Sequence, residues 1–242
     1  GAQPLPEFLA GGEPVALDFV RARARSVSAE HISDIMFTSG TTGRPKAVAT
    51  SHGQNIRAYS AWCTAVGLTA DDRYLIVSPF FHAFGYKAGI LACLIAGASI
   101  LPHTVFDAAQ VMERLRREAI TVLPGPPTLF QTLLELPQLS AAARPRLRLA
   151  VTGAAVVPLE LVERMKSELG FDMVITGYGL TESCGIATMC RAGDDAQTIA
   201  HTSGRAIEGV EVRVVDAAGA PVPVGAAGEV VIRGYNVMQG YF

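Results

Sequence analysis

The segment at positions 38–46, TSGTTGRPK, combines the residue types that bind phosphate groups. Its glycines allow backbone N–H groups to turn toward a common centre and form an anion-binding nest, and its hydroxyl groups add further donors. Lys46 supplies a positive charge suited to phosphate. The segment therefore predicts a cradle for a triphosphate, against the alternative of a flexible polar loop without a ligand. The residues assigned to the cradle are Thr38, Ser39, Gly40, Thr41, Thr42, Gly43 and Lys46.

Two further polar segments each follow an apolar stretch that is typical of a strand. In residues 177–183, GYGLTES, Thr181 can bind a phosphate oxygen, Glu182 can hold Mg²⁺ through one carboxylate, and Tyr178 offers a flat face to a nucleobase. Glu182 taken alone is also typical of a carboxylate at the start of a helix. In residues 152–158, TGAAVVP, small side chains allow a ring to lie against the backbone, although such residues also permit tight turns. Three such loops leaving neighbouring strands predict one shared nucleotide site.

The elements that must position these loops alternate between strand and helix patterns. Strands are predicted at 35–38, 73–79, 120–125, 147–153 and 172–179, and helices at 51–67, 106–119, 126–136 and 158–170. This alternation indicates an α/β fold with a mostly parallel sheet flanked by helices, in which ligands collect at the carboxyl ends of the strands. Residues 210–234 show a period of two around a turn at 217–221, which predicts antiparallel strands.

We therefore divide the chain into a leading segment (1–31), an α/β core (32–203) and the start of an antiparallel β subdomain (204–242). Residues 1–31 carry few signals of helix or strand.

The composition excludes several classes of protein. The net charge is −2, and the basic clusters at 21–25 and 144–148 are typical of solvated surfaces, so nucleic acid binding is not indicated. The longest apolar segment, 88–101, is shorter than the roughly 20 residues of a membrane helix and predicts a buried helix followed by a buried strand. We recognise no secretory leader. The cysteines show no metal-type spacing, so we expect four reduced thiols in a cytoplasmic protein, at Cys63, Cys93, Cys184 and Cys190.

From about position 32 to position 242 the chain resembles the adenylate-forming superfamily of acyl-CoA synthetases, peptide-synthetase adenylation domains and luciferases. The segments TSGTTGRPK, FFHAFG, GAA, YGLTE and GEVVIRGYNVMQGY occur in the family's order, and the first and fourth together are the most specific. The segments FFHAFGYKAG and TVLPGPPTLFQTLL are similar to those of actinobacterial fatty-acid-CoA-ligase-type enzymes. Among these the chain looks most like ligases that handle propanoate side chains on steroid ring remnants.

The resemblance implies ATP, Mg²⁺ and coenzyme A as cofactors, and a small carboxylic acid, fatty or steroid-derived, as substrate. In the family, the carboxylate attacks the α-phosphorus of ATP to give an acyl-adenylate and pyrophosphate, and coenzyme A then displaces AMP. Two anions must meet in this reaction, so charge neutralisation and positioning are its main requirements.

The same resemblance implies roles for single residues. Residues 38–46 would close over the β- and γ-phosphates, Thr181 would contact phosphate, and Glu182 would hold magnesium, with Thr41 as a further candidate ligand. His82 would gate the acyl carboxylate; the alternative is a core imidazole bonded to the backbone. The catalytic set is Lys46, His82, Thr181 and Glu182. The residues placed around adenine and the acid are His82, Phe84, Gly153, Ala154, Ala155, Tyr178, Gly179 and Leu180.

The chain also departs from the family pattern. An aspartate for the ribose, a hinge arginine and a catalytic lysine in a mobile C-terminal domain would lie beyond Phe242, so we expect little or no ligase activity from these residues alone. Ala47 occupies a position where glycine is usual, a change that is conservative only if its φ is negative.

Two other functions remain open. One is an adenylation domain serving a carrier protein, although residues 79–89 offer no carboxylate to grip an α-amino group. The other is a non-catalytic nucleotide-binding module.

Overall fold

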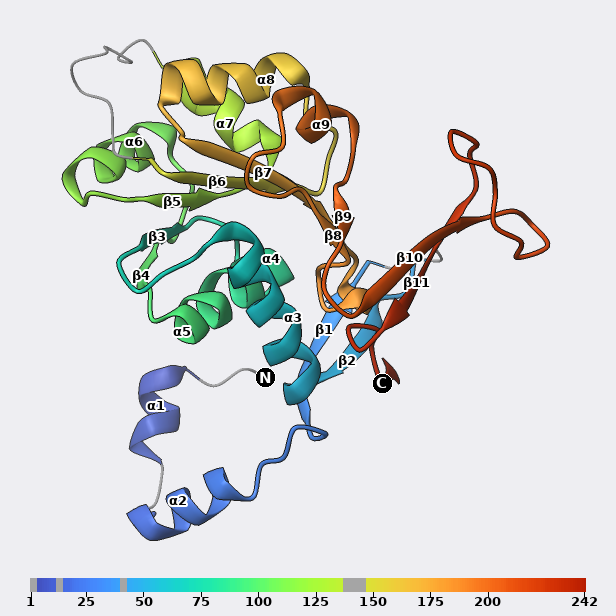
Figure 1. Cartoon of the computed structure of the whole chain (residues 1–242). Helices are drawn as coiled ribbons and strands as arrows, with labels where there is room; N and C mark the ends of the chain where they lie inside the picture. Colours follow the sequence, from blue (N-terminus) through green and yellow to red (C-terminus); the bar gives the residue numbers. More distant parts are fainter. Residues whose placement is uncertain (1–3, 12–14, 40–42, 137–146) are drawn as a thin grey trace.

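A seven-stranded sheet forms the centre of the structure, a computed structural model that describes residues 4–11, 15–39, 43–136 and 147–242. The strand order is β4-β3-β5-β6-β7-β8-β9, and the first five strands in this order are parallel (Figure 1). Their bounds are β4 (Ser99–Pro102), β3 (Arg73–Ile76), β5 (Val122–Pro124), β6 (Leu149–Gly153) and β7 (Met173–Tyr178). The short strands β8 (Thr188–Met189) and β9 (Arg205–Ala206) add antiparallel pairs beyond β7. The predicted α/β fold with a mostly parallel sheet is confirmed.

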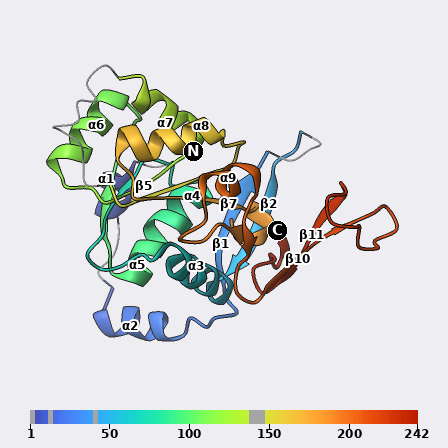
Figure 2. The same cartoon turned by 45° about the horizontal axis from the view of Figure 1, so that its top comes forward.

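Helices cover both faces of this sheet (Figure 1 and Figure 2). One face carries α6 (Ala108–Arg117), α7 (Pro127–Leu134) and α8 (Leu159–Arg164), and α9 (Ala196–His201) packs against α8. The other face carries α3 (His52–Val66), α4 (Ala83–Gly85) and α5 (Ala92–Ala96). Two wide π-helical turns, Tyr86–Leu91 and Met165–Leu169, connect α4 to α5 and extend α8. The predicted helix and strand within 88–101 are both present, but the prediction that the strand is buried was wrong, because β4 lies at the edge of the sheet and has no buried residue.

The four predicted helices are present with their ends within two residues of the predicted bounds, if the π-helical turn Met165–Leu169 is counted with α8. Ser51 caps α3, because its hydroxyl accepts a hydrogen bond from the Gln54 N–H while the Gln54 side chain accepts one from the Ser51 N–H. Gly67 ends the same helix with a φ of 59°, a left-handed conformation that glycine adopts without strain. Asp107 caps α6 by accepting from the Gln110 N–H at 2.8 Å.

A separate antiparallel sheet carries the glycine-rich segment, and here the sequence-based topology was wrong. The strand predicted at 35–38 lies in β1 (Ile32–Thr38), which pairs with β2 (Lys46–Ser51) and not with the parallel sheet. A third strand, β12 (Gly240–Tyr241), pairs with the other edge of β2. β2 was missed because it is the middle strand and is buried on both faces, so it shows no alternation of polar and apolar residues. The polar segment therefore connects the two strands of a hairpin and does not follow a strand of the large sheet.

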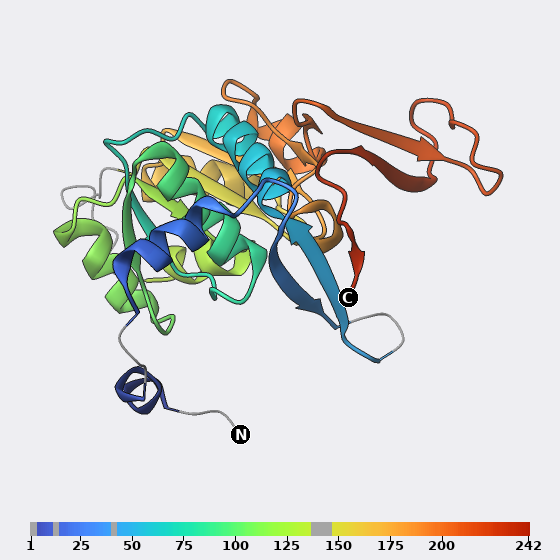
Figure 3. The same ribbon diagram turned by 90° about the horizontal axis from the view of Figure 1, so that it is seen from below.

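The antiparallel strands predicted near the end of the chain are present. β10 (Val210–Val215) pairs with β11 (Glu229–Gly234), and the two extend away from the rest of the molecule (Figure 3). Asp216 stabilises the predicted turn by accepting hydrogen bonds from the Ala218 and Ala220 N–H groups. At the other end, α1 (Leu5–Ala10) and α2 (Leu17–Arg25) form where the sequence shows few signals, and they contribute no buried residue.

All four cysteines are free thiols in the core, as the sequence predicts. Three of them, Cys93, Cys184 and Cys190, are completely buried. Burial raises the pKa of Cys63 and Cys184 to about 11 and that of Cys93 to about 12. These thiols are therefore protonated at neutral pH.

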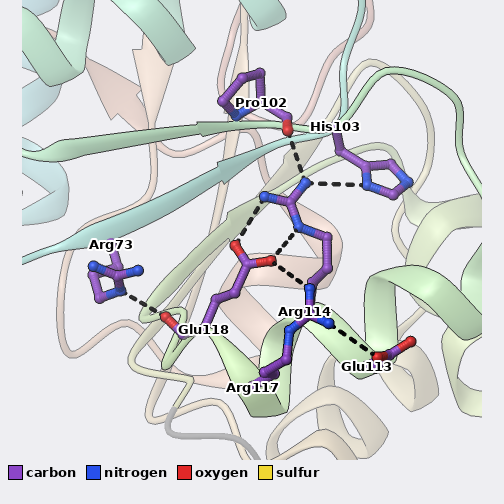
Figure 4. Close-up of polar contacts among 7 residues, drawn as sticks. All are labelled: Arg73, Pro102, His103, Glu113, Arg114, Arg117 and Glu118. Atoms are coloured by element: carbon purple, nitrogen blue, oxygen red, sulfur yellow. Dashed lines mark hydrogen bonds and ion pairs between the residues drawn. The ribbon is translucent and has the colours of Figure 1, made fainter.

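An arginine joins α6 to the edge strand β4 (Figure 4). The Arg114 guanidinium donates to both carboxylate oxygens of Glu118, at 2.8 and 2.9 Å, and to the carbonyl of Pro102 at 2.7 Å. Hydrogen bonding to Arg114 holds the pKa of Glu118 below its ordinary value. His103 lies at the same guanidinium, with its Nδ1 3.3 Å from Nη1. The cluster connects the helix to the loop that leaves β4.

A second ion pair joins three segments at the amino ends of the parallel strands. Arg148 donates to both oxygens of Asp72, at 3.0 and 2.5 Å, and Thr121 donates to the same carboxylate at 2.8 Å. Asp72 is only 4% exposed. Burial acts to raise the pKa of Asp72, but the hydrogen bonds from Arg148, Thr69 and Thr121 outweigh it and lower the pKa.

We predict that Arg148→Met lowers the free energy of unfolding by about 3 kcal/mol at neutral pH, because Asp72 would keep a buried charge without its partner. We take the lower end of the range for buried pairs because Arg148 is 32% exposed. Since the folded-state pKa of Asp72 is lowered, its contribution is present above the unfolded-state value of about 3.9 and is lost as the pH falls through the folded-state pKa. The difference between the two proteins should therefore be largest above about pH 5 and shrink in acid.

Urea unfolding followed by the fluorescence of Trp62, the single tryptophan of the chain, measures this difference. The control is Arg213→Met, which removes an exposed pair with Glu211 and should cost less than about 1 kcal/mol. Equal losses in the two variants, or a difference that does not change with pH, would contradict the prediction.

Candidate functional site

A cavity opens where β6 and β7 end and faces the hairpin of β1 and β2. Its volume is about 330 Å³. Polar residues from four segments line it, namely Thr38, His82, Thr152, Thr181 and Glu182. Apolar residues line the remainder, chiefly Trp62, Phe84, Val151, Ile186 and Met189. We refer to these two sets of lining residues as the polar wall and the apolar wall of the cavity.

Lys46 and Glu182 meet at one aromatic ring. The Lys46 ammonium lies 5.0 Å from the centre of the Tyr241 ring, within the range of a cation–π contact. The hydroxyl of the same tyrosine donates to Glu182 Oε1 at 3.0 Å. This hydrogen bond is the largest cause of the raised pKa of Tyr241. The two charged side chains, which the sequence assigns to one phosphate site, are thus brought together by a third residue.

Tyr241 was not among the residues selected from the sequence. It reaches the site because β12 pairs with β2, which places Tyr241 opposite Val48. The backbone of the same segment also bonds to the Glu182 loop, since the Met238 N–H donates to the Glu182 carbonyl at 2.8 Å. The motif GEVVIRGYNVMQGY contained the signal, but the pairing of strands this far apart in sequence is not visible in a local pattern.

Two glycines allow close backbone contacts where β6 and β7 end, one between the two strands and one within the loop after β7. A Cβ at Gly153 would lie 2.7 Å from the Gly177 carbonyl oxygen, and one at Gly179 would lie 2.4 Å from the Gly185 carbonyl oxygen. Ala154, next to Gly153, has a φ of 65°. Such a conformation is strained for a residue with a side chain, and strain of this kind concentrates at ligand sites.

A second cavity, of about 560 Å³, adjoins the first on the outer side of these loops. The two share Ala154, Gly177, Gly179 and Leu180. The second cavity also has Ala155 and Tyr178 in its lining, together with His201 and Thr202 from the end of α9. Of the residues predicted to surround adenine and the acid, Ala154, Ala155, Tyr178, Gly179 and Leu180 line this second cavity, whereas Gly153 lines only the first. Their contact with adenine stays a prediction.

His82 stands between the first cavity and a third, of about 420 Å³. Phe84 and Ala154 line both of these cavities as well. The His82 side chain is exposed, and its Nδ1 accepts a hydrogen bond from the Phe84 N–H at 3.1 Å. The alternative of a core imidazole is therefore wrong, although the bond to backbone that it assumed is present. His82 thus lines two adjoining cavities, and its role as a gate for an acid stays a prediction.

The predicted cradle is only partly described. Thr38 lines the first cavity and Lys46 begins β2. Ser39 and Gly43 flank the segment 40–42, and neither is among the residues that line the cavities. Gly40, Thr41 and Thr42 lie outside the described residues, so the assignment of Thr41 to magnesium stays a prediction. Ala47 is not among the described residues with positive φ, so alanine is tolerated at this position.

The donor set at Glu182 fits magnesium better than a transition metal. No group of three or more His, Cys, Asp or Glu residues that could hold a metal occurs within the described ranges. Magnesium bound to nucleotide commonly uses one or two carboxylates, with phosphate oxygens and waters completing its shell. Among the residues that line the three cavities, Glu182 is the only carboxylate.

Among the helices of the described residues, none has the length and apolar character needed to cross a bilayer.

Known proteins are similar to this chain both in sequence and in fold. A curated relative from Mycobacterium tuberculosis, named 3-[(3aS,4S,7aS)-7a-methyl-1,5-dioxo-octahydro-1H-inden-4-yl]propanoyl:CoA ligase, is 52% identical over 235 residues, which cover 97% of this chain and 44% of the relative. A Rhodococcus jostii protein of the same name is 49% identical over 241 residues, covering 100% of this chain and 45% of the relative. The chain thus spans less than half the length of these relatives.

Solved structures give the same result. ATP-bound MatB from Rhodopseudomonas palustris superposes with a TM-score of 0.80 at 29% identity, over 88% of this chain and 42% of that one. O-succinylbenzoate coenzyme A synthetase (MenE) from Bacillus subtilis, in complex with ATP and magnesium ion, superposes with a TM-score of 0.79 at 27% identity, over 89% of this chain and 44% of that one.

The family model described as "AMP-binding enzyme" matches residues 5–242. Almost the whole chain is covered by this match, and the loops that carry Lys46, Gly153 and Glu182 all lie within it. The chain therefore belongs to the family of AMP-binding enzymes.

Proposed function

We propose that the protein containing this chain is an ATP-dependent acyl-CoA ligase. In its first step the carboxylate of an acid attacks the α-phosphorus of ATP, which forms an acyl-adenylate and releases pyrophosphate. In its second step the thiol of coenzyme A displaces AMP and forms the thioester. The observation that carries the proposal is the convergence of Lys46 and Glu182 on Tyr241 beside a cavity whose other wall is apolar.

The polar wall accounts for the first step. An attacking carboxylate and a triphosphate repel each other, so cations and hydrogen-bond donors must hold both. Lys46 and the hydroxyl of Thr38 would contact the phosphates, and Glu182 would bind magnesium, which supplies further positive charge to them. Because Tyr241 is a neutral donor, it holds the Glu182 carboxylate in place without cancelling its charge.

The apolar wall indicates the kind of acid. Trp62, Phe84, Ile186 and Met189 line the first cavity, and Glu182 is its only carboxylate among the described lining residues. A site for amino acids needs an anion for the α-amino group, so an apolar acid is favoured. Thr152 Oγ1 is buried in this lining without a hydrogen-bond partner among the described residues, and can bond to a polar atom of the acid.

The relatives' names suggest a specific candidate. Both curated relatives are named for a propanoyl group on a fused bicyclic dione. A propanoic acid on a compact, mostly apolar ring system suits a cavity of about 330 Å³ with aromatic walls and few polar groups. We propose acids of this class as substrates, with ATP, Mg²⁺ and coenzyme A as the other reactants.

We predict that Lys46→Ala weakens MgATP binding by about 10- to 100-fold, because a charge-assisted hydrogen bond contributes about 1.5–3 kcal/mol. Isothermal titration calorimetry of the complete protein measures the change. The matched control is Lys166→Ala, since Lys166 lies in the wide turn that extends α8 and lines none of the three cavities around His82 and Ala154. Equal affinities for Lys46→Ala and the unmodified protein would remove the lysine from the site.

We predict that the complete protein releases pyrophosphate with an apolar ring-bearing propanoic acid at least tenfold faster, in kcat/KM, than with an amino acid of similar size. A pyrophosphate-coupled assay with and without coenzyme A measures both steps. Thioester formation with coenzyme A separates a ligase from an adenylation domain that serves a carrier protein. Nucleotide binding without pyrophosphate release for any acid would favour the non-catalytic module.

A further inference from the structure

A buried polar cluster lies behind the site and contains a fully buried lysine. Lys87 is 0% exposed, although lysine side chains are almost always at the surface. Its ammonium lies 3.1 Å from Asp34 Oδ1 and donates to Thr50 Oγ1 at 2.9 Å. Asn55 completes the cluster. We refer to Asp34, Thr50, Asn55 and Lys87 as the Lys87 cluster.

The donors and acceptors of this cluster match one another. The Thr50 hydroxyl donates to Asp34 Oδ1 at 3.1 Å, and the Asn55 amide donates to Asp34 Oδ2 at 2.5 Å and to Thr50 Oγ1 at 3.1 Å. Each carboxylate oxygen of Asp34 therefore has a partner, and the charge of Lys87 is neutralised at close range. Such an arrangement allows only one relative placement of the segments that contribute to it.

Those segments are the ones that carry the site. Asp34 lies in β1, four residues before Thr38, and Thr50 lies in β2, four residues after Lys46. Four residues of strand span about 13 Å, so the cluster lies one short strand length from the phosphate segment. Lys87 lies in the π-helical turn Tyr86–Leu91, one turn of helix after His82. π-Helical turns occur frequently at functional sites.

Helix α3 extends the connection to the third site loop. Asn55 and Tyr59 lie four residues apart and so share one face of α3. Tyr59 is buried, and its hydroxyl donates to the carbonyl of Cys184, two residues after Glu182, at 3.0 Å. The same turn brings Gly185 against Tyr59, since a Cβ at Gly185 would lie 2.7 Å from the hydroxyl. Figure 2 shows α3 between the hairpin of β1 and β2 and helix α5.

A stabilising role alone does not account for these residues. Well-packed apolar residues of similar volume often stabilise a core as well as a buried ion pair does, because both charges must lose their water. An ion pair adds specificity of orientation, because it fixes which groups face each other. In this chain the ion pair fixes the position of the segment that carries His82 relative to the hairpin that carries Lys46.

We propose that the Lys87–Asp34 ion pair is a positioning element that sets the placement of the acid relative to the phosphates of ATP. The proposal rests on the proposed function, because it assigns the acid to the His82 side and the phosphates to the Lys46 side. Without the pair, each substrate would still find its own contacts. The attacking oxygen would then be displaced from the α-phosphorus, and a displacement of 1 Å can reduce a rate by about 100-fold.

The test compares kcat and KM in the complete protein. We expect Lys87→Met to lower kcat for pyrophosphate release between 10- and 100-fold, while the KM values for ATP and for the acid change less than about threefold. The matched control is Arg148→Met, which breaks the partly buried pair with Asp72 at the opposite ends of the strands. We expect the control to lose thermal stability while keeping kcat within about twofold of the unmodified protein.

A second variant guards against loss of folding. Asp34→Asn with Lys87→Met removes both charges, so no unpaired charge is buried. The new amide oxygen can accept from Thr50, and the new amide NH2 group can donate to Asn55 if the Asn55 amide turns over. We expect the double variant to melt at a higher temperature than Lys87→Met and still to show the reduced kcat. Assays are run well below the lowest melting temperature of the set.

Three outcomes are possible. A low kcat with retained KM in both Lys87 variants, but not in Arg148→Met, supports the proposal. A kcat in the double variant equal to that of the unmodified protein overturns it and leaves the proposed function intact. Absence of pyrophosphate release from the unmodified protein with every acid overturns both, since the reaction in which the pair would act does not occur.

Discussion

The contact of Tyr241 with both Lys46 and Glu182 is the interaction on which the site depends. It joins the hairpin of β1 and β2 to the loop that leaves β7, although these elements belong to different sheets. This contact requires β12 to pair with β2. Backbone hydrogen bonds from the Gln239 N–H to the Ala49 carbonyl and from the Met238 N–H to the Glu182 carbonyl hold β12 in position. A cation and a carboxylate are thus kept near each other without forming an ion pair, which leaves both available to a charged ligand.

The fold supplies the other parts of the site by bringing several loops to the edge of the sheet at which the parallel strands end. The strands β6 and β7 are parallel neighbours, so their following loops meet at their carboxyl ends. Gly153 lets the ends of β6 and β7 come close together, and Gly179 lets the loop after β7 fold back on itself. Three cavities that share lining residues adjoin at this edge. The proposed reaction needs such an arrangement, because the nucleotide and the acid would each have to be held while they also touch.

The sequence predicted the parallel sheet, the caps of α3 and α6, and the membership of the chain in its family. These features depend on local patterns, namely the alternation of elements, the capping residues and motifs read in order. It did not predict that the strand before the glycine-rich segment belongs to a separate sheet, nor the strand β2, since both depend on pairing partners instead of local composition.

Single residues show the same limit. Glu182 and Lys46 were selected because their types suit phosphate and magnesium, and their roles remain predictions. Tyr241 was missed because it reaches the site only through the pairing of β12 with β2, two strands that are far apart in the sequence. Lys87 was missed as a buried charge because its partner, Asp34, lies in a segment whose local pattern indicates only a strand.

The burial of the four cysteines has a practical consequence for spectroscopy. Thiol reagents attack the thiolate, and burial keeps Cys63, Cys93 and Cys184 protonated and out of reach at neutral pH. A single cysteine introduced on the exposed hairpin of β10 and β11 would therefore react selectively with a maleimide dye or spin label. Within residues 1–242, one chosen position can therefore be labelled without first replacing the four buried cysteines.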